Sequence, residues 1–184
     1  MRAAIIGAGR IALGLAAERL HRSGYEVTVL GRGSVSAALR LCRAVEVELT
    51  DGWETERFLV PVRTVDLADR IAAVKSIASA DVVGTAVGAR TLPAVLDLLA
   101  EGLKRAARPV NVIAFENHEN AARIIRKGLR MRLGPGVDRH GFTGAVIARA
   151  VAHRVFTEDG HVRVVGDPPS EVVIDGLALV EPVP

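Results

Sequence analysis

A glycine-rich turn near the start of the chain, Gly7-Ala8-Gly9-Arg10-Ile11-Ala12, constrains the fold more than any other stretch. An apolar run, Ala3 to Ile6, precedes it within a strand expected over Arg2 to Ile6, and a run rich in alanine and leucine follows it to Arg22. In the pattern G-x-G-x-x-A, the first glycine permits a tight turn, the second lets the backbone approach a pyrophosphate, and the third small residue allows helix to pack on strand. Because the pattern follows an expected strand and opens an expected helix, we interpret it as a dinucleotide-binding loop. The alternative is a turn that holds no ligand.

Strands and helices alternate along most of the remaining chain. Apolar runs at Tyr25–Leu30, "DVVGTAVG" and "PVNVIAFEN" predict buried strands, and helices are expected over 10–22, 66–79, 91–107 and 121–133, with a short one ending near Arg43. Apolar residues make up 49% of the sequence and aromatic residues only 3%, which suits a core of aliphatic side chains under helices on both faces of a sheet. The sequence therefore predicts an α/β fold, a Rossmann-type doubly wound and mostly parallel sheet, in a single domain over residues 1–184.

Two β-rich segments depart from this alternation. The stretch "VEVELTDGWETERFLVPV" alternates apolar and polar residues on both sides of Asp51-Gly52, which predicts a β-hairpin insertion over about residues 45–63. We expect Val45–Thr50 to pair with Glu54–Val62. The tail, over about residues 141–176, is again typical of strands. We expect it to add strands to one edge of the sheet, giving a β-rich C-terminal edge.

Composition and charge exclude several classes of partner. The formal net charge is +3, but the basic residues form no dense run and aromatic residues are scarce, so we expect no nucleic-acid partner. Cys42 is the single cysteine and the five histidines are widely separated, so neither a disulfide framework nor a metal site is expected. No segment resembles a signal peptide or reaches membrane-spanning length. We therefore expect a cytoplasmic protein without a membrane partner.

The end of the second strand bears on the identity of the dinucleotide. An NAD site normally carries Asp or Glu there, whereas this chain reads "VTVLGRGS" and has no acid from Thr28 to Ala44. Arg32 and Ser34 are expected beside the adenosine ribose, and Arg10 beside the pyrophosphate or the 2′-phosphate. A charged hydrogen bond contributes roughly 1.5–3 kcal/mol. We therefore expect NADP(H) rather than NAD(H), with a solvated Arg32 as the alternative.

Four stretches, "GAGRIALG", "DVVGTAVGARTLPAVLDLLAEGL", "NVIAFENHENAA" and "GFTGAVIAR", occur in this order along the chain. Together they resemble the N-terminal domain of the mannitol-1-phosphate 5-dehydrogenase and polyol dehydrogenase family, and the resemblance covers nearly the whole chain, including the hairpin. It implies an NAD(P)-dependent oxidoreductase domain that takes part in hydride transfer between a nicotinamide and an alcohol or carbonyl group. The implied substrate is a small molecule of the sugar-alcohol or sugar-alcohol-phosphate type.

The resemblance also implies positions for the site. Thr85 to Gly88 would border the nicotinamide ribose, and Glu116 and Asn117 would lie near the nicotinamide and the substrate. Hydride transfer needs an acid or base nearby. The candidate catalytic residues are therefore Glu116, Asn117 and His118, although Asn117 could instead cap a helix and Glu116 could be a solvated carboxylate. The expected cofactor-binding residues are Gly7, Ala8, Gly9, Arg10, Ile11, Arg32, Ser34, Thr85, Ala86, Val87, Gly88 and Asn117.

The sequence also departs from the family. Ala148 stands where the family usually has Asp, directly before the arginine that matches Arg149. The family's catalytic lysine lies in a helical C-terminal domain, together with a partner asparagine and histidine. The three lysines of this chain, Lys75, Lys104 and Lys127, stand in no comparable pattern. We therefore expect a homodimer or a separate catalytic subunit to complete the reaction. The alternatives are a non-catalytic NADP(H)-binding sensor or regulatory module, or an excised domain of a longer dehydrogenase.

Overall fold

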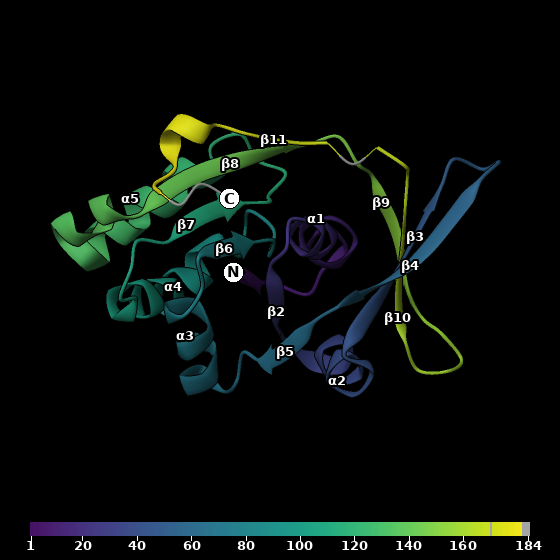
Figure 1. Ribbon diagram of the computed structural model, residues 1–184. Helices are drawn as coiled ribbons and strands as arrows, with labels where there is room; N and C mark the ends of the chain where they lie inside the picture. The colour runs from purple at the N-terminus through teal and green to yellow at the C-terminus, as the bar shows by residue number, and fades with distance from the viewer. Residues whose placement is uncertain (170, 182–184) are drawn as a thin grey trace.

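A twisted seven-stranded sheet forms the centre of the computed structural model, which describes residues 1–169 and 171–181 (Figure 1). Its strands lie in the order β11-β8-β7-β6-β1-β2-β5, and only β11 runs antiparallel to its neighbour. The strands are β1 (Arg2–Ile6), β2 (Glu26–Gly31), β5 (Arg63–Asp66), β6 (Val82–Thr85), β7 (Asn111–Ala114), β8 (Gly141–Ile147) and β11 (Val172–Ile174). The predicted Rossmann-type sheet is thus confirmed.

The strand order contains a reversal beside β1. From β1 the chain moves outward through β2 to β5, and it then returns to β6 on the other side of β1. In open parallel sheets, ligands bind at the carboxyl ends of the strands that flank such a switch point. The turn after β1 and the loop after β6 lie at this place.

Three helices cover one face of the sheet: α3 (Arg70–Ala78), α4 (Leu92–Arg105) and α5 (Ala121–Leu133). In α4 the residues at helical spacing, Leu92, Val95, Leu96, Leu99 and Leu103, are all buried. Pro93 lies in the first turn, where its missing N–H costs no intrahelical hydrogen bond. After α5 a 3₁₀ helix, η2 (Gly134–Arg139), leads into β8. The apolar stripes of these helices explain why this face of the sheet is a continuous aliphatic core.

The helix expected over 10–22 and α2 (Gly33–Cys42) cover the other face. The first of these contains a π-helical turn, η1 (Ala12–Ala16), before α1 (Ala17–Arg22), and the Ala17 N–H donates to the Ala12 carbonyl. Every residue of η1 is buried, because a second sheet lies against its outer side.

That second sheet has four strands in the order β4-β3-β10-β9. They are β3 (Ala44–Thr50), β4 (Thr55–Pro61), β9 (Val151–Phe156) and β10 (Val162–Gly166). The predicted hairpin is confirmed, with Thr50 opposite Thr55. The tail differs in part from the expectation. Although β8 and β11 do extend the edge of the central sheet, β9 and β10 join the hairpin instead, with β10 parallel to β3.

Packing against η1 explains why this second sheet forms where it does. The alternating residues Val45 and Val47 of β3 and Val162 and Val164 of β10 form one buried apolar face over η1. A Cβ at Gly14 would lie 2.8 Å from Val151 Cγ1, so only glycine allows the sheet to come this close. The polar outer face carries ion pairs such as Arg163 Nε to Glu46 Oε2 at 2.8 Å.

The segment after the hairpin also differs from the expectation. Residues 66–79 were expected to be helical, whereas Arg63–Asp66 forms edge strand β5 and α3 begins at Arg70. The Asp69 carboxylate accepts the Ala72 N–H at 3.0 Å and so caps the helix at its true start. The sequence of Arg63–Asp66 shows no apolar–polar alternation that would predict a strand. The segment becomes a strand by pairing with β2, which is a tertiary contact.

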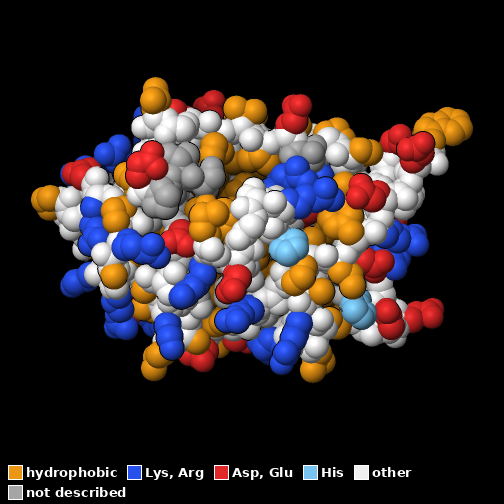
Figure 2. Space-filling model, viewed as in Figure 1, with side chains coloured by type: hydrophobic (Ala, Val, Ile, Leu, Met, Phe, Trp, Pro, Cys, Tyr) orange, Lys and Arg blue, Asp and Glu red, His pale blue; other side chains and the backbone are white. Residues whose placement is uncertain are grey.

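Basic and acidic side chains alternate over the surface in Figure 2, with several lysine and arginine side chains in the lower half of this face, over α3 and α2. Across residues 1–169 and 171–181, no helix is both long and apolar enough to cross a membrane.

Candidate dinucleotide site

The turn after β1 touches the loop after β6 directly. The Gly7 N–H donates to the Leu30 carbonyl at 2.9 Å, and the Ala86 N–H donates to the Ile6 carbonyl at 2.9 Å. Gly7 has φ +117°, and a Cβ there would lie 2.3 Å from the Ala86 carbonyl oxygen. Only glycine fits this position, because any side chain would both strain the backbone and push the two loops apart.

Gly9 meets a different environment. A Cβ on Gly9 would find only the Ala86 carbonyl oxygen, at an ordinary contact distance of 3.8 Å. Open space therefore lies in front of the Gly9 backbone, where the helix begins and the Leu13 N–H donates to the Gly9 carbonyl at 3.1 Å. A helix start preceded by an open glycine turn suits the phosphates of a dinucleotide, since its N–H groups and dipole attract anions. The residues present thus fit a pyrophosphate.

Two arginines join this turn to strand β9. Arg10 Nη1 donates to the Ala152 carbonyl at 2.6 Å, and Arg154 Nη1 donates to the Ala8 carbonyl at 2.8 Å. The guanidinium of Arg10 is therefore held at the β9 backbone, while the Arg10 main chain lies at the first position of the helix. Sequence reasoning missed Arg154, since 146 residues separate it from Ala8 and no local pattern marks it.

The end of β2 carries the predicted Arg32 and also an acid from another strand. Arg32 lies exposed directly before α2, with Ser34 exposed in its first turn. Asp66, at the end of β5, pairs in register with Gly31. Its carboxylate accepts the Ala68 N–H at 2.9 Å and Arg40 Nη1 at 3.2 Å. These hydrogen bonds, that of the Ala68 amide first, lower the pKa of Asp66, and the charge of Arg32 lowers it further.

Glu116 follows β7 and is only 5% exposed. Its Oε1 accepts the Val87 N–H at 2.9 Å and its Oε2 accepts the Gly88 N–H at 2.8 Å. The alternative of a solvated carboxylate is therefore wrong. Glu116 instead holds the loop after β6, in which Gly88 has φ +86°. Within the described part of the chain, the buried Thr85 hydroxyl has no hydrogen-bond partner.

Asn117 and His118 are exposed where β7 passes into α5. The His118 Nδ1 accepts the Asn120 N–H at 3.1 Å, and the His118 carbonyl accepts the Ala121 N–H at 3.0 Å. Asn120 is the residue that precedes α5, so the alternative of Asn117 as the helix cap is wrong. The catalytic roles of Glu116, Asn117 and His118 stay predictions.

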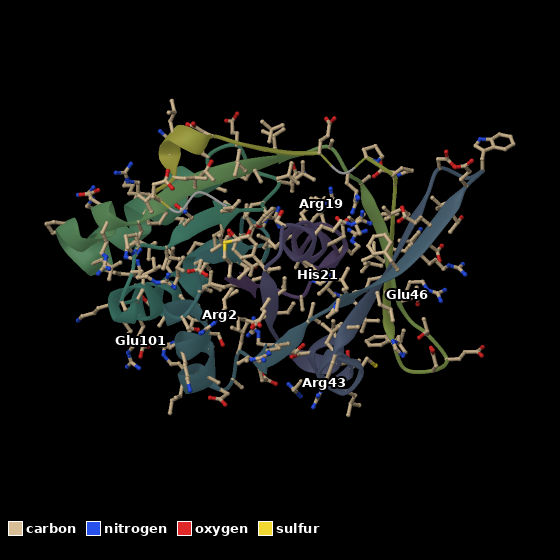
Figure 3. The ribbon with its side chains drawn as sticks, viewed as in Figure 1. Arg2, Arg19, His21, Arg43, Glu46 and Glu101 are labelled. Carbon is tan, nitrogen blue, oxygen red and sulfur yellow. The ribbon has the colours of Figure 1, made fainter. Side chains whose placement is uncertain are left out.

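Arg149, the arginine that follows Ala148, is buried beneath the second sheet. Its Nη1 lies 2.8 Å from the Gly14 carbonyl and 3.3 Å from Glu18 Oε2, and its Nε donates to the Pro169 carbonyl at 2.8 Å. Burial lowers the pKa of Arg149, although the Glu18 carboxylate opposes this effect. Arg19 lies on the same helix, between the two sheets (Figure 3). It also pairs with Glu18. Arg149 therefore links the β8–β9 connection to the helix formed by η1 and α1.

A sequence profile of the mannitol dehydrogenase Rossmann domain matches residues 1–183. This chain belongs to the mannitol dehydrogenase family. As the Rossmann domain of that family, it is a nucleotide-binding oxidoreductase domain. The sequence resemblance is confirmed, and it covers the switch point described above.

Relatives and a solved structure agree with this assignment. The mannitol-1-phosphate 5-dehydrogenase of Brevibacillus brevis is 30% identical over 197 residues, which cover 100% of this chain and 50% of the relative. The enzyme of the same name from Exiguobacterium sp. is 35% identical over 156 residues, 82% of this chain and 41% of the relative. Pseudomonas fluorescens mannitol 2-dehydrogenase, solved with NAD and D-mannitol, has a similar fold, with a TM-score of 0.79 at 15% identity over 95% of this chain and 49% of that one. This chain thus spans about half the length of the relatives that it matches.

Proposed function

We propose that this mannitol dehydrogenase domain binds NADP(H) at the switch point. We further propose that it forms the nucleotide-binding part of a dehydrogenase acting on a sugar alcohol or a sugar-alcohol phosphate. The observation that carries the proposal is the contact between Gly7 and the Ala86 carbonyl oxygen, with an open backbone at Gly9 beside it. This arrangement brings the start of a helix and the loop after β6 next to each other at the carboxyl ends of β1 and β6. When bound, the dinucleotide supplies or accepts the hydride.

The preference for NADP(H) rests on charge at the end of β2. Arg32 is exposed there, and Arg40 already pairs with Asp66 at 3.2 Å. Two guanidinium groups and one carboxylate leave a net positive charge at the place expected for the adenosine ribose. A 2′-phosphate would gain from this charge, whereas a free 2′-hydroxyl would find Asp66 engaged by Arg40 and the Ala68 N–H.

The proposed roles of the residues after β7 differ. Glu116 acts through the loop that it holds, because both its oxygens already accept backbone N–H groups. It would orient Val87 and Gly88 beside the nicotinamide ribose. His118 is the candidate acid or base, since its Nδ1 accepts a hydrogen bond and its Nε2 is left to exchange a proton with a substrate hydroxyl. Asn117, exposed beside it, would hydrogen-bond substrate or cofactor.

A partner or a second copy would complete the catalytic site. Exposed apolar side chains lie along β8, β11 and the short 3₁₀ helix η3 (Gly176–Ala178). Val146 is 71% exposed and Leu177 is 99% exposed. An apolar surface of this kind favours association. The Brevibacillus brevis relative aligns with this chain over only 50% of its own length, so its other half has no counterpart in the aligned region. We propose that this surface receives the rest of the catalytic site.

Titration of the purified chain with NADPH and with NADH, followed by the fluorescence of the reduced nicotinamide, tests the cofactor assignment. We expect NADPH to bind at least roughly tenfold more tightly than NADH, as one additional charged hydrogen bond implies. Tighter binding of NADH would overturn the NADP(H) preference, and binding of neither would overturn the site itself. Oxidation of NADPH with keto-sugar phosphates, compared between the wild type and His118→Ala, tests the reaction. His153→Ala, on exposed strand β9, is the matched control.

A further inference from the structure

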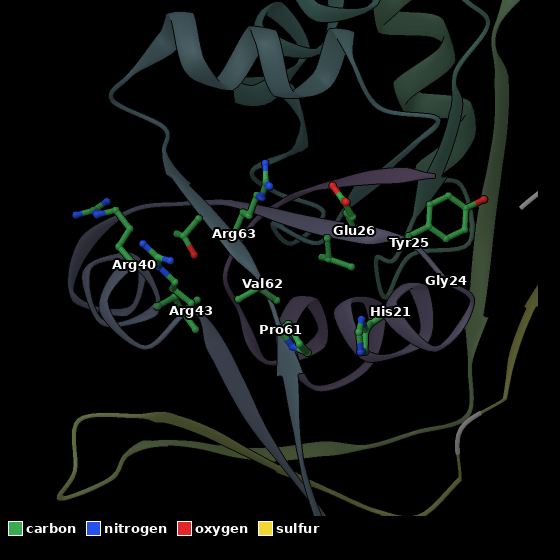
Figure 4. A pocket seen from close by; sticks show the side chains of 12 residues that line it. His21, Gly24, Tyr25, Glu26, Arg40, Arg43, Pro61, Val62 and Arg63 are labelled. Atoms are coloured by element: carbon green, nitrogen blue, oxygen red, sulfur yellow. The ribbon is translucent and has the colours of Figure 1, made fainter.

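A second cavity, of about 770 Å³, opens at the amino-terminal ends of β2 and β5 (Figure 4). The proposed dinucleotide site lies at the opposite, carboxyl ends of these parallel strands. The floor is apolar and includes Val27, Leu39 and Val62, all at most 4% exposed. A cavity of this size, with an apolar floor and a few polar groups, is typical of a small-molecule site.

The rim of the cavity is cationic. Arg40, Arg43 and Arg63 line it, and Glu26 is the single carboxylate among its lining residues. Arg40 is engaged with Asp66. Among the side chains that the structure describes, neither Arg43 nor Arg63 makes an ion pair or hydrogen bond. Two uncommitted guanidinium groups at the rim of a cavity with an apolar floor favour an anion with an apolar body.

The backbone of Arg43 is held in an unfavourable conformation. Its φ is +55°, and within residues 1–169 and 171–181 no other residue except glycine has a positive φ. Its N–H donates to the Leu39 carbonyl at the end of α2, and its carbonyl accepts the Val62 N–H at 2.9 Å. Glycine would adopt this conformation more easily. The arrangement fixes the Arg43 backbone against that of Val62, the residue before Arg63.

A buried hydroxyl in the wall also lacks a partner. Thr64 lines the cavity, and its Oγ1 is shielded from solvent yet has no hydrogen-bond partner among the described residues. A buried polar atom without a partner is costly and is usually satisfied by a ligand or by ordered water. This observation is independent of the arginines. Because Oγ1 is shielded from solvent, it would reach a ligand in the cavity only after the Thr64 side chain turns.

We propose that this cavity is a second ligand site, which binds a small phosphate monoester with an apolar body. Arg43 and Arg63 would hold the phosphate, Thr64 Oγ1 would donate or accept one hydrogen bond, and the apolar floor would cover the remainder of the molecule. The proposal does not depend on the dinucleotide site, because the cavity shares no side chain with the turn after β1, and Arg40, which pairs with Asp66, is not among the groups that would hold the phosphate.

Phenyl phosphate is the probe, and isothermal titration calorimetry of the full chain is the measurement. Inorganic phosphate and benzyl alcohol represent the two halves of the probe. We expect phenyl phosphate to bind at a ratio of one to one and more tightly than either half. Arg43→Gly and Arg63→Gln should each weaken binding by roughly tenfold, as expected for a charged hydrogen bond. Thr64→Val should weaken it less.

Controls separate this site from the proposed dinucleotide site and from loss of the fold. Arg43→Gly should not lower the melting temperature, because glycine relieves the positive φ. Arg123→Gln, at an exposed arginine of α5, should leave binding unchanged. Gly9→Ala obstructs the dinucleotide turn and should also leave probe binding unchanged. No binding at millimolar phenyl phosphate, or binding that Gly9→Ala abolishes and Arg43→Gly does not affect, would overturn the proposal.

Discussion

The carboxylate of Glu116 accepts hydrogen bonds from two consecutive amides, those of Val87 and Gly88, at 2.9 and 2.8 Å. The end of β7 thereby fixes the loop that follows β6. Strand β6 ends at the switch point of the sheet, where a dinucleotide would lie, and β7 is its neighbour on the side away from β1. The carboxylate is buried, and each of its oxygens accepts one of these backbone N–H groups.

We expect Glu116→Gln to loosen this loop, because an amide has one acceptor oxygen and sets its NH₂ group against a backbone N–H. The loss of one charged hydrogen bond costs about 1.5–3 kcal/mol, so the Kd for NADPH should rise by roughly ten- to a hundredfold. Fluorescence titration measures the change. Glu158→Gln, at an exposed glutamate of the β9–β10 turn, should bind like the wild type. Unchanged affinity in Glu116→Gln would show that the loop does not contact the cofactor.

Gly7 and Gly9 should respond differently to alanine. In Gly7→Ala the new Cβ would lie 2.3 Å from the Ala86 carbonyl at a φ of +117°, so we expect a loss of stability of about 2–4 kcal/mol. In Gly9→Ala the nearest atom is 3.8 Å away, so stability should change little while dinucleotide affinity falls. Urea unfolding and NADPH titration on both variants measure the two effects. Equal stability of the two variants would contradict the contact between the loops.

Arg32 and Arg40 should act on cofactor preference. Arg32→Gln removes the exposed charge after β2 and should weaken NADPH binding by roughly tenfold with little effect on NADH. Arg40→Gln leaves the Asp66 carboxylate without its guanidinium partner, so binding should shift further toward NADH. The ratio of the two Kd values is the measurement, and Arg123→Gln, at an exposed position of α5, is the control. A ratio that neither substitution alters would place the adenosine ribose elsewhere.

His140 should make stability depend on pH. Burial, together with the nearby charge of Arg139, lowers the pKa of His140 from 6.5 to about 4. Its Nδ1 accepts the Val110 N–H at 3.1 Å. Because the unfolded chain binds the proton more readily, this contribution to stability is complete above pH 6.5 and is lost as the pH falls toward 4. The full shift corresponds to at most about 3 kcal/mol.

Urea unfolding between pH 7.5 and 4.5 measures this dependence. The variant His140→Asn should be less stable at neutral pH but should show a flatter pH profile. His153→Asn, at an exposed position, should keep the steep profile of the wild type. If His140→Asn kept that profile, another group would be responsible for the acid sensitivity.

Local chemistry explains what the sequence predicted well. The turn at Gly7 to Ala12, the helix start after it and the hairpin at Asp51-Gly52 each depend on residues within a few positions of one another. Glycine content, apolar period and turn residues act over that range, so these features can be recognised without a structure. The alternation of strands and helices then left few topologies to choose from.

The second sheet and the surroundings of the glycine turn were decided by contacts between residues far apart in the chain. The pairing of β10 with β3 joins Arg163 to Glu46 across 117 residues, and Arg154 reaches Ala8 across 146 residues. Asp66 beside the end of β2, and Glu116 with the two amides that it accepts, are further contacts between residues distant in the chain. Such contacts depend on which apolar faces bury one another and leave no periodic signal in the sequence. The sequence by itself therefore determined the glycine turn after β1 and the sheet class, whereas only the tertiary structure decided what surrounds that turn.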